Sequence, residues 1–370
     1  MCHRDNPMTA PLSPLPLAGE GRVRAVWFTA PCDDTTMRAQ PRRSALLLFA
    51  CATIACDATR AAEISGAGAT FPAPIYTQWA DAYRRETGTV VRYDAVGSGK
   101  GLELIRSRSV DFGASDVPES QADLERDNLV EFPVVIGGVV PVVNISGIAP
   151  GELKLSGEVL AAIFGGRVTR WNDAEIGALN PALHLPSSRI TVVHRDDASG
   201  TTFLWTRYLE SEDAIWRRDV GHGTRVDWPT GVGGTGNEGV ASYVKRTRAS
   251  IGYVEYAYAK AHRLSDVSLR DASGAFVRVD PERFAEAIAF SASDPAAGEP
   301  IGTGRGWPIT GATFILVSRT GKDAMQNRAV LDFFIWALTH GQALARGLDY
   351  VPLPDDTASR IAARLNAMNP

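Results

Sequence analysis

The polar segment His194-Arg195-Asp196-Asp197-Ala198-Ser199-Gly200-Thr201-Thr202 carries groups that could bind a small anion. An apolar run, 190–193, precedes it as a predicted buried strand, and the apolar residues of 203–209 follow at helical spacing. At a helix start the first backbone N–H groups lack partners inside the helix, and the helix dipole favours negative charge. Arg195 adds a planar, permanently charged fork that suits phosphate or carboxylate oxygens. The segment predicts an anion site; the alternative is an ordinary Ser/Thr helix cap beside a surface arginine.

Two glycine-rich turns near the start of the folded chain resemble this arrangement. A short strand from Glu63 leads into Gly66-Ala67-Gly68-Ala69-Thr70-Phe71-Pro72, and Pro72 suits the first turn of a helix. Thr70 and the Phe71 N–H are therefore expected at a helix entrance, as ligand groups or as a structural cap.

The second turn, Val96-Gly97-Ser98-Gly99-Lys100-Gly101, follows a predicted strand over 90–95 and precedes a predicted helix over 102–108. It is not a P-loop, because no Ser or Thr follows Lys100 and Asp94 stands where the leading glycine should be. The turn could still present Ser98 to an anion, and Lys100 is expected to face solvent.

A carboxylate ends the next predicted strand, Val110-Asp111-Phe112-Gly113-Ala114-Ser115-Asp116. Asp116 is either a pocket residue or a residue that merely precedes the helix expected over 120–126. The segment Gly231–Gly236 matches the dinucleotide pattern G-x-G-x-x-G, but Asp227-Trp228-Pro229-Thr230 precedes it in place of an apolar strand. We therefore predict a glycine-rich loop there and no nucleotide site.

The remaining elements alternate between strands and helices, which predicts an α/β protein. Nearly continuous apolar sequence over 134–145 predicts a strand buried on both faces, of the type found in parallel sheets, crossing between two domains. Further strands are expected over 250–257 and 308–317, and helices over 156–164, 171–179, 239–246, 282–290, 323–344 and 357–368, with a loop over 291–305.

The first 62 residues differ from the rest of the 370-residue chain. A basic segment at 37–43, an apolar run over 44–55 and small residues up to Ala62 predict a secretory signal peptide over 37–62. Residues 1–36 are expected to be a mis-annotated or disordered leader. A lipoprotein acylated at Cys51 or Cys56 is the less favoured alternative to a free periplasmic protein.

The positions of the cysteines and the net charge limit which reactions and partners the cleaved protein could have. Every cysteine precedes residue 63, so the cleaved protein would have neither a disulfide nor a thiolate. Without the seven arginines and five acidic residues of 1–62, the chain carries 31 basic and 37 acidic residues, a net charge of −6. This balance argues against nucleic acid or an anionic membrane as partner. An anion would have to be bound by local dipoles.

Several motifs, in this order and spacing, closely resemble the periplasmic phosphate-binding proteins of bacterial ABC importers, over essentially all of 63–370. They are Gly66-Ala67-Gly68-Ala69-Thr70-Phe71-Pro72-Ala73-Pro74, Gly97-Ser98-Gly99, Asp111-Phe112-Gly113-Ala114-Ser115-Asp116, Arg195-Asp196-Asp197-Ala198-Ser199-Gly200-Thr201, Ile251-Gly252-Tyr253-Val254-Glu255-Tyr256-Ala257 and Trp307-Pro308-Ile309-Thr310. One departure is Gly99-Lys100, where relatives often carry Ser-Gly.

The resemblance implies a two-lobed, Venus-flytrap fold of type II-like form with the ligand dehydrated in the cleft. The lobes are expected at 63–143 with 310–370, and at 144–309. The resemblance places these groups on phosphate: Thr70, the Phe71 N–H, Ser98 and Asp116 from the first lobe, and Arg195, Ser199, Gly200 and Thr201 from the second. The resemblance also implies that Asp197 pairs with Arg195 and contacts the ligand.

Physical chemistry gives Asp116 a particular role in such a site. A dry cavity rich in donors binds any tetrahedral dianion, so donors alone cannot distinguish phosphate from sulfate. A buried carboxylate repels a fully deprotonated anion but accepts a hydrogen bond from one that keeps a proton. Hydrogen phosphate keeps a proton near neutral pH and sulfate does not, so Asp116 is expected to reject sulfate.

The favoured function is therefore high-affinity phosphate binding and delivery to the permease and ATPase subunits of an ABC importer, by a monomer without cofactor or metal. The alternatives are a phosphate scavenger and a phosphate-ester hydrolase with Ser199 as nucleophile. Against the hydrolase, the six histidines show no paired metal-ligand spacing and no serine lies in a G-x-S-x-G motif. We therefore predict that the protein is not an enzyme.

Overall fold

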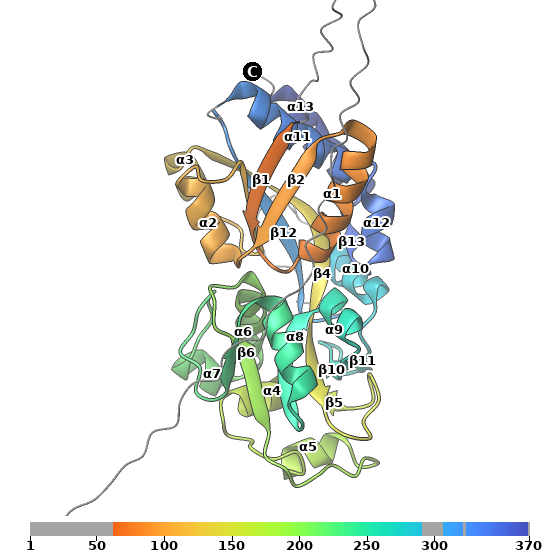
Figure 1. The fold of residues 1–370 in the computed structure, drawn as a ribbon. Coiled ribbons are helices and arrows are strands. Elements are labelled where there is room, and N and C mark those ends of the chain that lie inside the picture. The colour runs from red at the N-terminus through yellow and green to blue at the C-terminus, as the bar shows by residue number, and fades with distance from the viewer. Residues whose placement is uncertain (1–61, 291–305, 321–322, 369–370) are drawn as a thin grey trace, which may run out of the picture. The chain divides into compact units, whose positions relative to one another are not determined.

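The structure is a computed structural model that describes residues 62–290, 306–320 and 323–368 (Figure 1). The expected leader, the signal peptide, both candidate acylation sites and the loop over 291–305 lie outside the described residues. The strands are β1 (Glu63–Gly68), β2 (Val90–Ala95), β3 (Phe112–Ser115), β4 (Leu129–Asn144), β5 (Lys154–Leu155), β6 (Thr191–Arg195), β7 (Val232–Gly234), β8 (Ser250–Glu255), β9 (Ser265–Asp266), β10 (Ser268–Arg270), β11 (Phe276–Val277), β12 (Thr310–Ser318) and β13 (Val351–Pro352).

Helices alternate with most of these strands, as an α/β protein requires. They are α1 (Ala73–Thr87), α2 (Ser98–Arg106), α3 (Gln121–Arg126), α4 (Gly157–Phe164), α5 (Ala174–Leu179), α6 (Gly200–Glu212), α7 (Ala214–Asp219), α8 (Gly236–Arg246), α9 (Tyr256–His262), α10 (Pro281–Phe290), α11 (Ala324–Thr339), α12 (Gln342–Gly347) and α13 (Asp355–Ala367).

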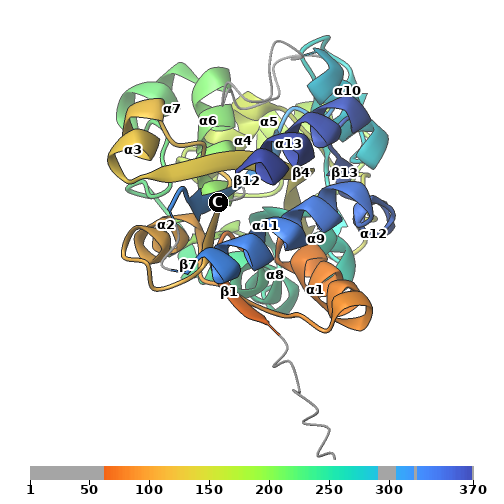
Figure 2. The ribbon, with the colours of Figure 1, turned by 90° about the horizontal axis from the view of Figure 1, so that it is seen from above.

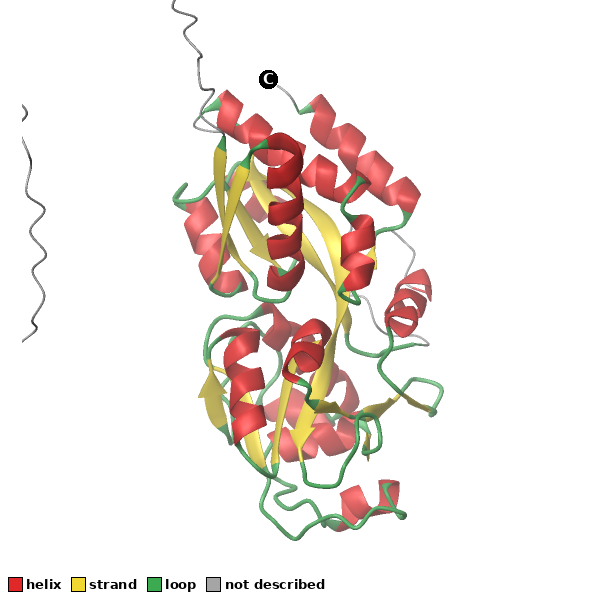
Figure 3. Cartoon of the chain, turned by 45° about the vertical axis from the view of Figure 1, so that its right-hand side comes forward, coloured by secondary structure: helices red, strands yellow, loops and turns green. Residues whose placement is uncertain are grey.

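These elements form two lobes joined by the long strand β4 (Figure 3). In the first lobe β1 pairs in parallel with β2 and β3, and β12 pairs antiparallel with both β3 and β4. In the second lobe β6 pairs in parallel with β7 and β8, and β8 pairs antiparallel with β4. The two-lobed fold is therefore as expected, whereas the lobe boundaries at 143/144 and 309/310 stay predictions.

Strand β4 changes partner at one point along its length. Gly138 pairs with Thr310 of β12, and the next residue, Val139, pairs with Glu255 of β8. The expectation of a parallel strand here was wrong, because β4 is antiparallel to β12, β13, β8 and β9. Its unbroken apolar sequence reflects burial on both faces, which antiparallel neighbours can also provide.

The packing of helix α1 shows how the sequence forms the wall of the first lobe. Ile75, Tyr76, Trp79 and Tyr83 are its buried residues, at helical spacing. The helix ends at Gly88, whose positive φ of 80° lets its N–H bond to Arg84 O. Further along the chain, helices α11 and α13 pack against each other over the same lobe (Figure 2). The buried face of α1 holds the preceding Thr70–Phe71 turn in place.

Four helix predictions differ from the structure, and one of these, the helix expected over 239–246, begins earlier, at Gly236. The helix expected over 102–108 begins earlier, at Ser98, and the one expected over 171–179 begins later, at Ala174. The helix expected over 323–344 is two helices separated at His340–Gly341. A Cβ at Gly341 would lie 2.5 Å from Trp79 Nε1, which donates to Gly341 O at 2.8 Å. The close approach of Trp79 to Gly341 therefore coincides with the break between α11 and α12.

Candidate functional site

The first-lobe candidates all follow the carboxyl ends of neighbouring parallel strands. Thr70 and Phe71 lie between β1 and α1, Ser98 is the first residue of α2 after β2, and Asp116 directly follows β3. The carboxyl ends of parallel strands share one edge of a sheet, where ligands of open α/β sheets commonly bind. The topology therefore gathers these candidates, and Thr70, Ser98 and Asp116 are each at most 5% exposed.

The second-lobe candidates lie on one strand–turn–helix unit. Arg195 is the last residue of β6, and Ser199 is the N-cap of α6, with its Oγ accepting from Thr202 N at 3.0 Å. Gly200 and Thr201 are the first residues of that helix. The expected helix start is present, and the Ser/Thr cap is part of it.

The two lobes meet at these residues. The Ser98 Oγ accepts hydrogen bonds from Gly200 N at 3.1 Å and from Asp116 N at 3.3 Å. Gly99 N donates to Ala198 O at 3.1 Å. A Cβ added at Gly200 would lie 2.5 Å from Asp116 Cβ and 2.6 Å from Ser98 Oγ. Only glycine at position 200 allows this approach.

The buried Arg195 and the partly buried Asp197 form an ion pair. Arg195 Nε donates to Asp197 Oδ1 at 2.6 Å, and its Nη2 contacts Oδ2. Burial alone would raise the pKa of the Asp197 carboxyl, but the hydrogen bonds and charge of Arg195, with the Gly236 N–H, lower it. Asp197 therefore stays ionised and holds the guanidinium, whose Nη1 reaches Thr201 Oγ1 at 3.4 Å.

Asp116 is the buried carboxylate of this group, at 2% exposed. Thr313 Oγ1 donates to Asp116 Oδ1 at 2.7 Å, and Ser98 Oγ lies 3.5 Å from Oδ2. Burial raises the pKa of Asp116 to about 7, although Thr313, Arg195 and Ser98 act in the opposite direction. The carboxyl can therefore exchange a proton near neutral pH.

Sequence reasoning missed the residues that tie these groups together. Asn237, in the first turn of α8, donates from Nδ2 to Thr70 Oγ1 at 2.8 Å and to Thr201 Oγ1 at 3.2 Å. Tyr258 OH donates to Thr70 O, and Tyr350 OH donates to Phe71 O, each at 2.7 Å. Asn237 lies at the end of the glycine-rich segment 231–236, which the sequence predicted as a loop. The segment instead contains β7 and the start of α8.

The structure thus brings all nine candidate residues into one region: Thr70, Phe71, Ser98, Asp116, Arg195, Asp197, Ser199, Gly200 and Thr201. Their contact with a ligand stays a prediction. Lys100 is exposed and pairs with Glu103 at 2.7 Å, as expected for a solvent-facing residue. Within residues 62–290, 306–320 and 323–368, no cluster of three or more His, Cys, Asp or Glu side chains could hold a metal ion.

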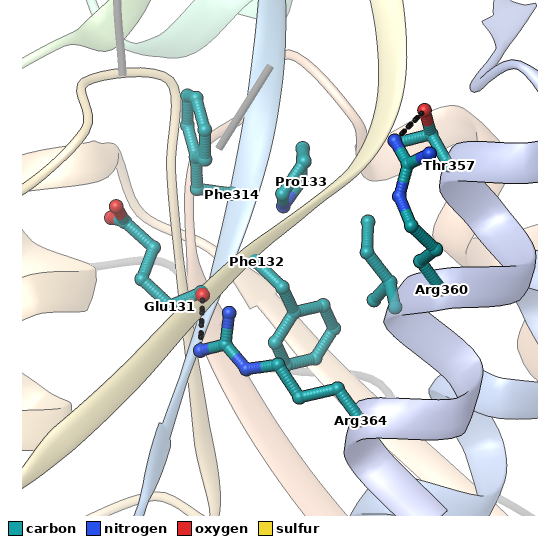
Figure 4. Close-up of a pocket in the computed structure, with 8 residues that line it drawn as sticks. Glu131, Phe132, Pro133, Phe314, Thr357, Arg360 and Arg364 are labelled. Atoms are coloured by element: carbon teal, nitrogen blue, oxygen red, sulfur yellow. Dashed lines mark hydrogen bonds between the residues drawn. The ribbon is translucent and has the colours of Figure 1, made fainter. Parts of the chain in front are cut away.

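A separate pocket of about 210 Å³ lies between β4, β12 and helix α13 (Figure 4). Arg360 and Arg364 reach over it from α13, and Glu131 lies on β4; Arg364 Nη2 is 3.5 Å from Glu131 O. None of the nine candidate residues lines this pocket. The candidate site is therefore the contact region between the lobes, not this hollow.

Comparison with known proteins agrees with this architecture. A family model described as a PBP superfamily domain matches residues 54–335, so the two-lobed class defined by the fold is that of the PBP superfamily. The phosphate-binding protein PstS of Haemophilus influenzae is 49% identical over 310 residues, covering 82% of this chain and 93% of the relative. PstS of Pasteurella multocida is 46% identical over 328 residues, covering 87% and 95%. The chain belongs to the PstS family of phosphate-binding proteins.

A solved structure shows the same fold at greater sequence distance. The phosphate-binding protein of Stenotrophomonas maltophilia superposes with a TM-score of 0.61 at 22% identity, covering 82% of this chain and 94% of that one. At this identity the likeness supports the fold alone.

Proposed function

We propose that this chain binds inorganic phosphate between its lobes and delivers it to a membrane ABC importer. The observation that carries the proposal is the convergence of hydroxyls, helix-start N–H groups and Arg195 around one buried carboxylate, Asp116. Such a site supplies many donors to anionic oxygens and a single acceptor for a ligand proton. The PstS relatives are named for the same ligand.

Each of the nine candidate residues has a role in this proposal. The N–H groups of Phe71, Gly200 and Thr201 and the hydroxyls of Thr70, Ser98, Ser199 and Thr201 donate to phosphate oxygens. Arg195, oriented by Asp197, adds the formal positive charge, and Asp116 accepts the proton of hydrogen phosphate.

The proposal includes a place and partners. The protein acts in the periplasm as a monomer and hands phosphate to the permease and ATPase subunits of the importer. No helix within the described part of the chain is both long and apolar enough to cross a membrane. Genomic neighbours that encode permease and ATPase subunits would support transport over the scavenger function.

The PstS family is one of binding proteins rather than enzymes, and we propose that this chain has no turnover either. The Ser199 Oγ accepts from Thr202 N as the cap of α6. The ring of His194 stacks on Trp228 with centroids 4.7 Å apart, and its Nδ1 lies 3.1 Å from Arg195 O. Neither arrangement supplies a base to the Ser199 hydroxyl.

Calorimetric titration of the purified, phosphate-stripped protein tests the function. Phosphate and arsenate, which both keep a proton near neutral pH, should bind with one site per chain, and sulfate should bind far more weakly. Failure to bind phosphate, or equal affinity for sulfate, would contradict the proposal. Release of phosphate from a phosphate ester in clean preparations would favour the hydrolase.

A further inference from the structure

Asn237 lies at the junction of the two lobes, and none of the roles assigned above includes it. It is 0% exposed and occupies the first turn of α8. Its backbone N and its Nδ2 both lie within hydrogen-bond distance of Thr70 Oγ1, at 3.2 and 2.8 Å. Nδ2 also lies 3.2 Å from Thr201 Oγ1. One amide thus contacts a hydroxyl from each lobe.

The backbone of Glu255 determines which way this amide faces. Glu255 N lies 2.9 Å from Asn237 Oδ1. A backbone N–H can only donate, so the amide oxygen must face Glu255 and the amide nitrogen must face the two threonines. In the reversed orientation the Asn237 NH2 group would face the Glu255 N–H inside the protein. Both groups are donors, so both would lack an acceptor.

This orientation decides the direction of the Thr70 hydroxyl. A hydroxyl has two acceptor positions and one donor hydrogen. Both acceptor positions of Thr70 Oγ1 are taken by N–H donors of Asn237, one from the backbone and one from the side chain. The hydrogen of Thr70 remains available, and it can only be donated.

Thr201 is constrained in the same way. Its Oγ1 accepts from Asn237 Nδ2 at 3.2 Å and faces Arg195 Nη1 at 3.4 Å. A guanidinium carries donors only, so the Thr201 hydroxyl also keeps its hydrogen for another acceptor.

We propose that Asn237 is a positioning residue that fixes the Thr70 and Thr201 hydroxyls as donors toward the bound anion. The proposal rests on the phosphate-binding function proposed above. Ionised phosphate oxygens only accept hydrogen bonds, so a hydroxyl turned to present its lone pairs would repel them. Because Thr70 and Asn237 belong to different lobes, this orientation of Thr70 is complete only when the lobes are in contact.

Two substitutions separate this role from general packing. Asn237→Ala removes the side-chain donor, and the phosphate Kd should rise about tenfold. Asn237→Asp keeps the shape but replaces the donor with an acceptor that takes the threonine hydrogens, so the Kd should rise more than for alanine, by about a hundredfold. Thermal unfolding establishes that each variant is folded, and Asn237→Ser replaces either one that is not.

A double-substitution cycle tests whether Asn237 acts through the hydroxyl. We compare the fold-increase in the phosphate Kd caused by Asn237→Ala in two backgrounds. In Thr70→Val this fold-increase should be smaller than in the wild-type protein by a factor of about three or more. The matched control is Asn180→Ala. Asn180 is a buried asparagine, 5% exposed, that makes three side-chain hydrogen bonds to Lys154 and Ile176. Its loss should lower the melting temperature and leave the phosphate Kd unchanged.

The outcomes are distinct. Wild-type affinity in a folded Asn237→Asp variant, or fully additive losses in the cycle, would overturn the role of Asn237 while leaving phosphate binding intact. Absence of phosphate binding by the wild-type protein would instead overturn the proposed function. Equal phosphate affinity of the Asn237→Ala and Asn237→Asp variants would show that Asn237 contributes only through packing.

Discussion

The Thr313 hydroxyl donates a hydrogen bond to Asp116 Oδ1 at 2.7 Å, so the two oxygens of this carboxylate have different surroundings. Oδ2 is the oxygen nearest the second lobe, because a Cβ at Gly200 would lie 2.6 Å from it. Thr313 therefore leaves Oδ2 as the oxygen that can accept a proton from a ligand held between the lobes.

The first prediction is that Asp116→Asn removes discrimination against sulfate. The amide has nearly the same shape but can donate to an unprotonated oxygen and carries no charge to repel a dianion. The sulfate Kd should fall at least about tenfold. Competition titrations of sulfate against phosphate measure the change, and unchanged selectivity would remove Asp116 from its proposed role.

The pKa of Asp116, which burial raises to about 7, predicts how sulfate binding depends on pH. Below this value the carboxyl is protonated and can donate to sulfate, whereas above it the carboxylate repels the anion. The sulfate Kd of the wild-type protein should therefore fall as the pH is lowered from 8 to 6. Asp116→Asn should show no such slope. A slope of the same size in both proteins would assign the titration to another group.

Arg195→Ala should raise the phosphate Kd about a hundredfold, since it removes a buried donor and leaves Asp197 as an uncompensated charge beside the anion. Arg225→Ala is the matched control. Arg225 is an exposed arginine whose Nη1 donates to Asp196 O at 2.9 Å. Similar effects of the two substitutions would indicate attraction by overall charge and not a specific contact.

Gly200→Ala should prevent the lobes from reaching the contact seen here, because the new methyl group would overlap Asp116 and Ser98. The phosphate Kd should rise by about a hundredfold or more with little loss of stability, since alanine favours the helix. The control is Gly177→Ala in α5, where a Cβ meets no atom within 4 Å. Small-angle scattering would compare compaction on adding phosphate, and normal compaction of Gly200→Ala contradicts the prediction.

Glu131 predicts a pH dependence of stability outside the site. Burial raises its pKa to about 8, and the charge of Glu119 adds to this, although the Glu119 N–H opposes it. The protonated form stabilises the fold below the ordinary pKa near 4.5, and this contribution is lost as the pH rises through about 8. Glu131→Gln should therefore raise the melting temperature by about 2–4 °C at pH 8.5 and leave it unchanged at pH 4.5. An equal change at both values would point to packing.

Most of the architecture could be predicted from local sequence. Apolar runs bounded by glycine gave β1, β2 and β12 to within a few residues, and Pro72 indicated the start of α1. The break between α11 and α12 could not be predicted, because it accompanies contact with Trp79, 262 residues earlier. Helical spacing continues across that break, so the pattern alone predicts one helix.

The candidate site was predictable where a motif carries the chemistry itself. Thr70, Ser98 and Arg195 each lie in a turn whose residue types indicate anion binding. Asn237 and Thr313 carry no such signal, because one follows a glycine run that resembles a loop and the other lies inside an apolar strand. Their importance depends on which residues they face across the fold, and a single sequence does not reveal that.

The pairing of β12 has a consequence for how the protein is made. β12 lies between β3 and β4 in the first-lobe sheet, although about 170 residues separate Thr310 from Asn144, the end of β4. A ribosome therefore finishes β6, β7 and β8 before it synthesises the strand that joins β3 to β4. Under the periplasmic location proposed above, β3 and the first half of β4 must not pair wrongly while the chain crosses the membrane, so export should depend on components that hold the chain unfolded.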